Sequence, residues 1–183
     1  MNTIAKLAFL TAVRAKSNMT LATHGAMGAA VALLPVHPIL ALTMAFASHF
    51  ALDALPHWDY EILSIDGEAE AVGIVKMKAG PAFKKDIVRI GADGFLGLFL
   101  AALVFWLSGS PVALSLVVAS TVLAMLPDFL QFLYGRLGTM PLAFIQKIHN
   151  LAHTKRKLNG QPVLGVLSQA ALVALIIILV VWL

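Results

Sequence analysis

Histidines and aspartates recur near the ends of several apolar segments of this 183-residue sequence. The set with the spacing and residue types of metal ligands consists of His24, His49, Asp53, Asp128, His149 and His153. Imidazole nitrogens and carboxylate oxygens together suit Zn²⁺, Mn²⁺ or Fe²⁺, whereas Ca²⁺ prefers oxygen alone. The chain contains no cysteine, so thiolate ligation is excluded. The composition of the set therefore predicts a divalent metal site, with Zn²⁺ expected first and Mn²⁺ or Fe²⁺ as alternatives.

The spacing within this set supports the prediction. His49 and Asp53 are four residues apart, as are His149 and His153, so each pair would project from one face of a helix. Two ligands one helical turn apart can share one ion, and carboxylates can complete its shell. The number of candidate ligands is large enough for one ion or for two.

Three further residues near the set are candidates for catalysis. A metal-bound water becomes acidic near neutral pH and can attack a phosphoryl or acyl centre. His57, Asp59 or Asp93, where they are not ligands, would orient that water or act as the general base. Such polar groups within or beside membrane helices are costly to bury, and they are therefore functional hypotheses by default.

Each of these residues also has a purely structural interpretation. An isolated pair of histidines one turn apart is common, and His149 and His153 could be interfacial residues. His24 could lie at a membrane interface, and Asp128 could be a solvated carboxylate beside a proline kink. Asp93 could pair with Arg89 on its own helix. The convergence of the whole set on one layer of the protein favours the metal site.

The elements that must position these residues are membrane helices. Sixty per cent of the residues are hydrophobic, 12% are charged, and the mean hydropathy is +0.90, which is far more apolar than a soluble domain. The apolar runs approach the length of about 20 residues that crosses a bilayer. Five such runs are present: 20–34, 38–55, 87–107, 111–133 and 163–183. We expect an all-α polytopic bundle of about five transmembrane helices plus an interfacial helix, forming one domain over residues 1–183.

The connecting segments differ in length and polarity. Short turns at 35–38 and 108–111 predict two tight helical hairpins. Residues 59–85 form a polar loop, and residues 139–157 form a capping segment with Pro141 at a plausible helix start. Residues 1–18 are a possible interfacial extension, and their short, Lys6-interrupted apolar core does not resemble a signal peptide.

The basic residues predict the orientation. With five crossings, every Lys and Arg falls on one side of the membrane, which the positive-inside rule assigns to the cytoplasm. The N-terminus, the polar loop and the capping segment would then be cytoplasmic, in what we expect to be a bacterial inner membrane. The net charge of +4 is explained by contact with membrane lipid, and we expect no nucleic-acid partner. The oligomeric state is left open.

Short motifs around the candidate ligands resemble two groups of metal enzymes. Ser48-His49 followed by Asp53 is similar to an element of the membrane-bound metal-dependent hydrolase family, and His49-Phe50, Asp53 and Pro56-His57 are similar to zinc-dependent phospholipases C. Further similarity to the hydrolase family lies in Thr23-His24 with Gly28, in Leu126-Pro127-Asp128, and in His149 with His153-Thr154. The order of these elements along the chain differs from that of the family. The resemblance implies metal-dependent hydrolysis of a phosphoester or lipid.

We therefore expect a membrane-embedded, metal-dependent hydrolase that acts at the cytoplasmic face on a phosphoester or lipid. The alternative is a non-enzymatic membrane protein that binds a metal ion or proton, in transport or in a structural or accessory role. Conduction is disfavoured because residues 163–183 are almost entirely apolar.

Overall fold

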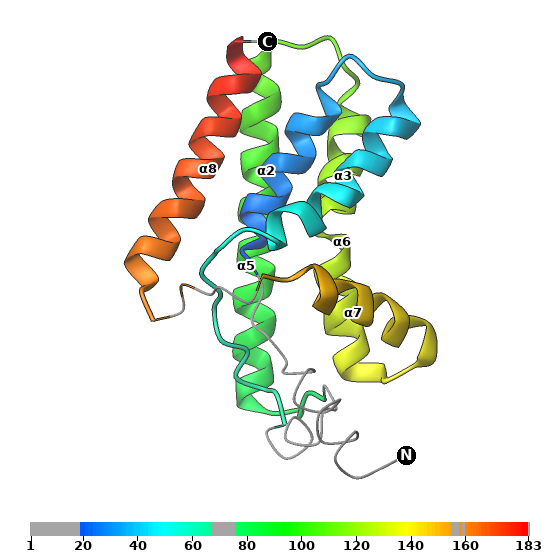
Figure 1. Ribbon diagram of the computed structural model, residues 1–183, viewed down its shortest axis with the longest axis vertical. Helices are drawn as coiled ribbons and strands as arrows, with labels where there is room; N and C mark the ends of the chain where they lie inside the picture. Colours follow the sequence, from blue (N-terminus) through cyan, green and yellow to red (C-terminus); the bar gives the residue numbers. More distant parts are fainter. Residues whose placement is uncertain (1–18, 67–75, 155–157, 159, 183) are drawn as a thin grey trace.

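The computed structural model of the protein describes residues 19–66, 76–154, 158 and 160–182. Within these ranges the chain forms helices and no β-strand, apart from one isolated bridge between Ile65 and Met77. The helices are α2 (Leu21–Ala32), α3 (Pro38–Asp53), α5 (Pro81–Ser108), α6 (Leu114–Leu137), α7 (Met140–Ala152) and α8 (Pro162–Trp182) (Figure 1). The all-α prediction is confirmed, whereas the predicted interfacial extension, residues 1–18, lies outside the described residues.

Three helices are long and apolar enough to cross a membrane. They are α5, α6 and the stretch Pro162–Val180 of α8, which identifies the chain as an integral membrane protein. By contrast, α2 has 12 residues and α3 has 16, both fewer than the roughly 20 that a crossing needs. The predicted count of about five crossings is therefore not confirmed.

Helices α2 and α3 form the first predicted hairpin, and this hairpin reaches only part of the way along the bundle. Its turn lies at the same end as the connection between α5 and α6 (Figure 1). At the other end of the hairpin, the Asp93 carboxylate accepts hydrogen bonds from Leu21 N and Ala22 N, at 2.7 and 3.1 Å. Asp93 is near the middle of the 28-residue α5. The start of α2 and the end of α3, which carry candidate ligands, therefore lie beside the middle of the long helices.

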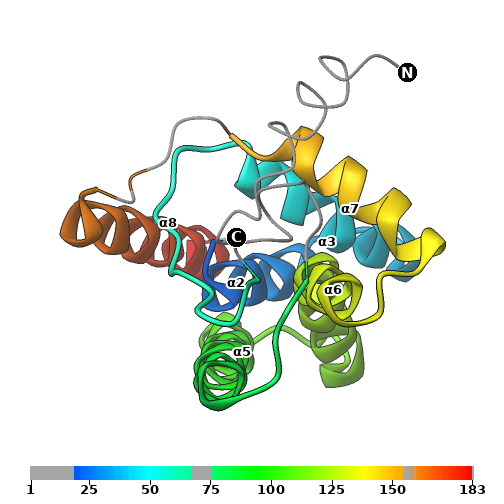
Figure 2. The same ribbon diagram turned by 90° about the horizontal axis from the view of Figure 1, so that it is seen from below.

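Helix α2 is the centre of the bundle, enclosed by α3, α5, α6 and α8 (Figure 2). Small residues allow this close packing. A Cβ atom on Gly25 would lie 2.9 Å from the Gly97 backbone of α5, and one on Gly28 would lie 2.7 Å from Ser120 O of α6. The backbone positions of α2, α5 and α6 are therefore determined at contacts where no side chain intervenes.

The segment between α3 and α5 is held to the bundle at two places. Asp86 of α5 accepts hydrogen bonds from Leu63 N and Ser64 N, and Arg136 of α6 donates to Met77 O. Helix α5 begins at Pro81, so residues 81–85 of the predicted loop are helical. Proline is favourable in the first helical turn because its missing N–H has no partner there anyway.

The predicted capping segment contains helix α7. Pro141 lies in its first turn, as expected, and the helix ends at Ala152. His153 N still donates to His149 O, so both histidines remain on the last turn. Residues 155–157 of the predicted segment lie outside the described residues.

Candidate metal centre

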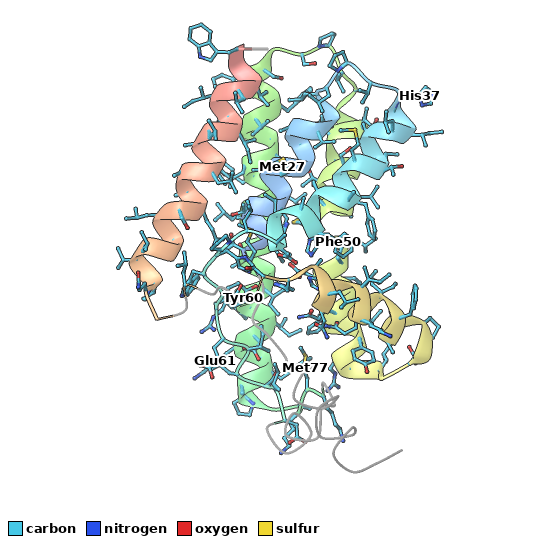
Figure 3. The ribbon with its side chains drawn as sticks, viewed as in Figure 1. Met27, His37, Phe50, Tyr60, Glu61 and Met77 are labelled. Atoms are coloured by element: carbon cyan, nitrogen blue, oxygen red, sulfur yellow. The ribbon has the colours of Figure 1, made fainter. Side chains whose placement is uncertain are left out.

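Five separate segments bring their histidines and aspartates to one buried cluster. His24 comes from α2, His49 and Asp53 from α3, His57 and Asp59 from the chain after α3, Asp128 from α6, and His149 and His153 from the end of α7. All eight side chains are buried. The six predicted ligands and two of the three predicted catalytic residues therefore lie together, whereas His37 is exposed at the far end of the hairpin (Figure 3).

Two imidazole nitrogens at the centre of the cluster lie near two carboxylate oxygens, at separations close to those between the ligands of a tetrahedral metal ion. His149 Nε2 lies 2.8 Å from Asp53 Oδ2, 3.0 Å from His49 Nε2 and 3.5 Å from Asp128 Oδ1. His49 Nε2 lies 3.2 Å from Asp53 Oδ2 and 3.6 Å from Asp128 Oδ1. Ligand atoms about 2.0–2.1 Å from a tetrahedral zinc ion are separated from one another by roughly 3.3–3.4 Å. The observed distances bracket this value.

The orientation of His49 is determined by a backbone hydrogen bond. Its Nδ1 lies 2.8 Å from Ala124 O. A carbonyl oxygen only accepts, so Nδ1 must carry the proton, and in the neutral ring Nε2 presents its lone pair to the cluster. Metal-ligating histidines are typically held in this way, by a hydrogen bond from the other ring nitrogen.

His57 is also oriented by a hydrogen bond from its Nδ1 to a backbone carbonyl, and it belongs to a second group of candidate metal ligands. Its Nδ1 donates to Leu55 O at 2.7 Å, and its Nε2 lies 2.8 Å from Asp59 Oδ1. Ligand atoms of Asp53, His57 and His153 also lie within 4.8 Å of one another. Asp53 is therefore shared between this group and the central four atoms. Because a lone pair and a carboxylate oxygen both accept, a proton or a metal ion is required between His57 and Asp59.

His24 stacks on His49 with 4.0 Å between the ring centroids. Its Nε2 lies 3.4 Å from Asp53 Oδ1, and neither ring nitrogen has a hydrogen-bond partner among the described residues. Both oxygens of Asp128 and Nδ1 of His149 are likewise buried without such a partner in that part of the chain. Buried polar atoms of this kind are rare unless a ligand, ion or water satisfies them.

The charge of the cluster also fits a cation. Asp53 and Asp128 are buried, and in the described part of the chain their ion-pair partners are histidines rather than lysines or arginines. Burying a carboxylate without a compensating charge is strongly unfavourable. A divalent cation would compensate both charges and use the lone pairs that converge between them, so these residues are able to hold a metal ion.

Asp93, the third predicted catalytic residue, caps the start of a helix. It is not among the described side chains that come within ligand distance of one another. Its carboxylate caps the first turn of α2, and it neighbours the buried Tyr60, whose pKa is raised by burial and by the negative charge of Asp93. We interpret Asp93 as a residue that positions α2, and thereby His24.

This interpretation predicts the behaviour of Asp93→Ala. Loss of two hydrogen bonds at the helix start is expected to lower the free energy of unfolding by about 1–2 kcal/mol. The metal content of the folded protein should not change, as measured by mass spectrometry beside thermal unfolding in detergent. Complete loss of metal at unchanged stability would instead place Asp93 in the metal site.

Sequence reasoning missed one polar residue that orders the cluster. Gln169 lies within the otherwise apolar α8 and is buried. Its side-chain carbonyl accepts from Thr20 Oγ1 at 2.6 Å, and its amide donates to Trp58 O at 2.7 Å. It thereby joins α8 to the start of α2 and to the residue after His57. The available signal was a lone amide in a long apolar run, which is itself costly in a membrane.

The end of α7 is attached to the end of α3 by backbone hydrogen bonds. Thr154 N donates to Asp53 O, and Leu158 N donates to His57 O. These bonds hold His149 and His153 against α3, although the two segments are about a hundred residues apart in sequence.

Comparisons with known proteins do not assign a family or a function to this chain. No family model, no curated protein and no solved structure matches the chain. The motifs shared with metal-dependent hydrolases therefore remain a resemblance. What is established is an all-α integral membrane protein with buried histidine and aspartate groups that can hold a metal ion.

Proposed function

We propose that this protein is a membrane-embedded, metal-dependent hydrolase. The observation that carries the proposal is that His49 Nε2 and His149 Nε2 both lie close to Asp53 Oδ2 and to Asp128 Oδ1, with nitrogen–oxygen separations of 2.8–3.6 Å. Zn²⁺ is the metal that such a nitrogen and oxygen set favours, with Mn²⁺ or Fe²⁺ as alternatives.

The chain supplies the groups that hydrolysis needs beside the ion. A bound divalent ion polarises a phosphoryl or acyl oxygen and acidifies water. His49, His149, Asp53 and Asp128 would hold such an ion in place. His57 Nε2 and Asp59 Oδ1 lie 2.8 Å apart and share one proton, so the pair would accept a second proton, released by water, on the Asp59 carboxylate.

The depth of the cluster favours a membrane-associated substrate. It lies beside the middle of α5. Helix α8 contacts the start of α2 and Trp58 through Gln169, and between its start and Gln169 it carries the exposed apolar side chains Val163, Leu164 and Leu167. A phosphoester or ester at the edge of the hydrocarbon could reach this layer. We therefore propose a phosphoester or lipid substrate.

We place the site at the cytoplasmic face of a bacterial inner membrane. The start of α5, the end of α6 and helix α7 lie in the same half of the molecule (Figure 1). The described lysines and arginines lie before α5 or in its first turns, at the end of α6 and on α7: Lys76, Lys78, Lys84, Lys85, Arg89, Arg136 and Lys147. The turns at residues 33–37 and 109–113, at the other end, contain none. This asymmetry supports a cytoplasmic location of the basic end.

The test separates metal ligands from the proton acceptor. We expect stoichiometric metal in the detergent-purified protein, measured by mass spectrometry, and its loss in a His49→Ala, His149→Ala double variant together with all hydrolysis of phosphoester substrates. His57→Ala should keep its metal and lose at least about 100-fold in turnover, the scale of general base catalysis.

Two results would contradict the proposal. Absence of metal after incubation with Zn²⁺, Mn²⁺ or Fe²⁺ would exclude the metal site. Retained metal without hydrolysis of any phosphoester or lipid ester would favour the non-enzymatic alternative, a metal-binding protein. A lower metal content in His57→Ala would place His57 among the ligands.

A further inference from the structure

A cavity of about 610 Å³ lies between the first half of α5 and the second half of α6. Its walls include Ile90, Gly91, Gly94 and Leu98 of α5 and Met125 and Phe129 of α6. Tyr60 and Met77, from the segment that precedes α5, close one side, and Figure 3 shows both beside that half of the helix. The volume is in the range of sites that bind small molecules.

The cavity reaches the candidate metal centre through Asp128. This residue lines the cavity and also lies within 3.6 Å of His49 Nε2 and 3.5 Å of His149 Nε2. Its side chain is 6% exposed, and neither carboxylate oxygen has a hydrogen-bond partner among the described residues. A molecule in the cavity would therefore have one end at the metal ligands.

The remainder of the wall is almost entirely apolar and faces the bilayer. Phe95 and Phe129 line the cavity from its two long walls and are 76% and 56% exposed. Both belong to helices that are long and apolar enough to span the membrane, so in a bilayer the rim between them would face the lipid chains. An apolar cavity with such a rim is accessible from the hydrocarbon without passing through water.

Glycines of α5 make room for this cavity. Gly91, Gly94 and Gly97 recur every three residues, but they meet different surroundings. Gly97 packs against the backbone of α2, with Leu21 O at 3.0 Å from an added Cβ, whereas an added Cβ on Gly91 would have no atom within 4 Å. Close packing between helices thus accounts for the glycine at position 97 but not for the glycine at position 91. At Gly91 the missing side chain leaves open space in the cavity wall.

We propose that this cavity binds an acyl chain of a membrane lipid, which enters from the bilayer between α5 and α6 and places the lipid's polar end at Asp128. The proposal names the substrate class of the proposed function as a long-chain lipid. It rests on the proposed function only for the hydrolysis of that lipid. The binding itself is testable without any hydrolysis.

The direct test is photolabelling of the full chain in vesicles of phosphatidylethanolamine and phosphatidylglycerol. The probe is a phosphatidylglycerol with a diazirine within one acyl chain, and labelled peptides are identified by mass spectrometry. We expect labelling concentrated on the cavity walls of α5 and α6. Gly91→Leu, which places a side chain in the cavity, should lower that labelling about tenfold, equivalent to about 1.4 kcal/mol.

Two further variants make the result specific. Val122→Phe narrows the cavity from α6 and should have the same effect as Gly91→Leu. Ala102→Leu, an equally small-to-large change at an exposed position of α5 outside the cavity, should leave the labelling as in the unmodified protein. Metal content and thermal unfolding of each variant establish that the labelling differences do not arise from misfolding.

The outcomes test the acyl-chain proposal separately from the proposed hydrolase function. Labelling spread evenly over the outward faces of α5, α6 and α8, or unaffected by Gly91→Leu and Val122→Phe, would overturn the acyl-chain proposal even if the protein hydrolyses phosphoesters. Labelling in the cavity by a protein that hydrolyses nothing would support it while contradicting the proposed function. If hydrolysis occurs, Gly91→Leu should lower the ratio of long-chain to short-chain turnover, and an unchanged ratio would count against the proposal.

Discussion

Replacing Asp53 with asparagine is expected to remove bound metal from the whole cluster. Its Oδ2 lies within 3.2 Å of Nε2 of His49, His149 and His153, and its Oδ1 lies 3.4 Å from His24 Nε2. Loss of a partner that only supports a ligand already lowers metal affinity about 10–100-fold. Loss of this shared carboxylate should therefore lower it by more than about 100-fold. Titration with Zn²⁺, followed by mass spectrometry, measures the change.

The same variant should no longer be stabilised by added metal. Metal at 100 times its dissociation constant stabilises the folded state by about 2.7 kcal/mol, and this gain should disappear in Asp53→Asn. Asp66→Asn, at a position paired with Lys78 outside the cluster, is the matched control and should retain the metal response. An equal metal response in Asp53→Asn and the parent would refute the assignment of Asp53 as a ligand.

A single methyl group at Gly28 is expected to disrupt both the bundle and the metal centre. The added Cβ of Gly28→Ala would lie 2.7 Å from Ser120 O and 2.9 Å from Thr121 Cα, both backbone atoms of α6. Helix α2 would have to move away from α6. Overpacking of this kind lowers the free energy of unfolding by about 1–3 kcal/mol. Because His24 lies one turn earlier on α2, metal affinity should fall as well.

Gly91→Ala is the matched control for this prediction. Its added Cβ would have no atom within 4 Å, and alanine favours helix by about 1 kcal/mol over glycine. This variant should be at least as stable as the parent and keep its metal. Thermal unfolding in detergent and metal content decide both predictions. Equal stability of Gly28→Ala and Gly91→Ala would show that α2 and α6 are not in contact at Gly28.

The sequence by itself determined the membrane class, the helical fold and the members of the candidate site. Hydrophobic runs indicate membrane helices because an apolar segment of sufficient length has no other stable environment. The pair His49 and Asp53 could be placed on one helical face because the period of the helix is invariant. All six predicted ligands are indeed brought together in the structure. Their convergence was predictable because each lies near the end of an apolar segment, and consecutive antiparallel segments bring alternate ends to the same level.

The tertiary structure decided what depends on how the helices pack. Asp93 and Asp128 both lie on long apolar helices, yet Asp128 faces the histidines whereas Asp93 caps α2. Local sequence does not distinguish them, because the rotation of each helix is set by its contacts with α2, at Gly97 for α5 and near Ser120 for α6. The role of Gln169 and the cavity beside Asp128 have the same origin. Each arises from contacts between segments far apart in the chain, which periodicity and composition do not encode.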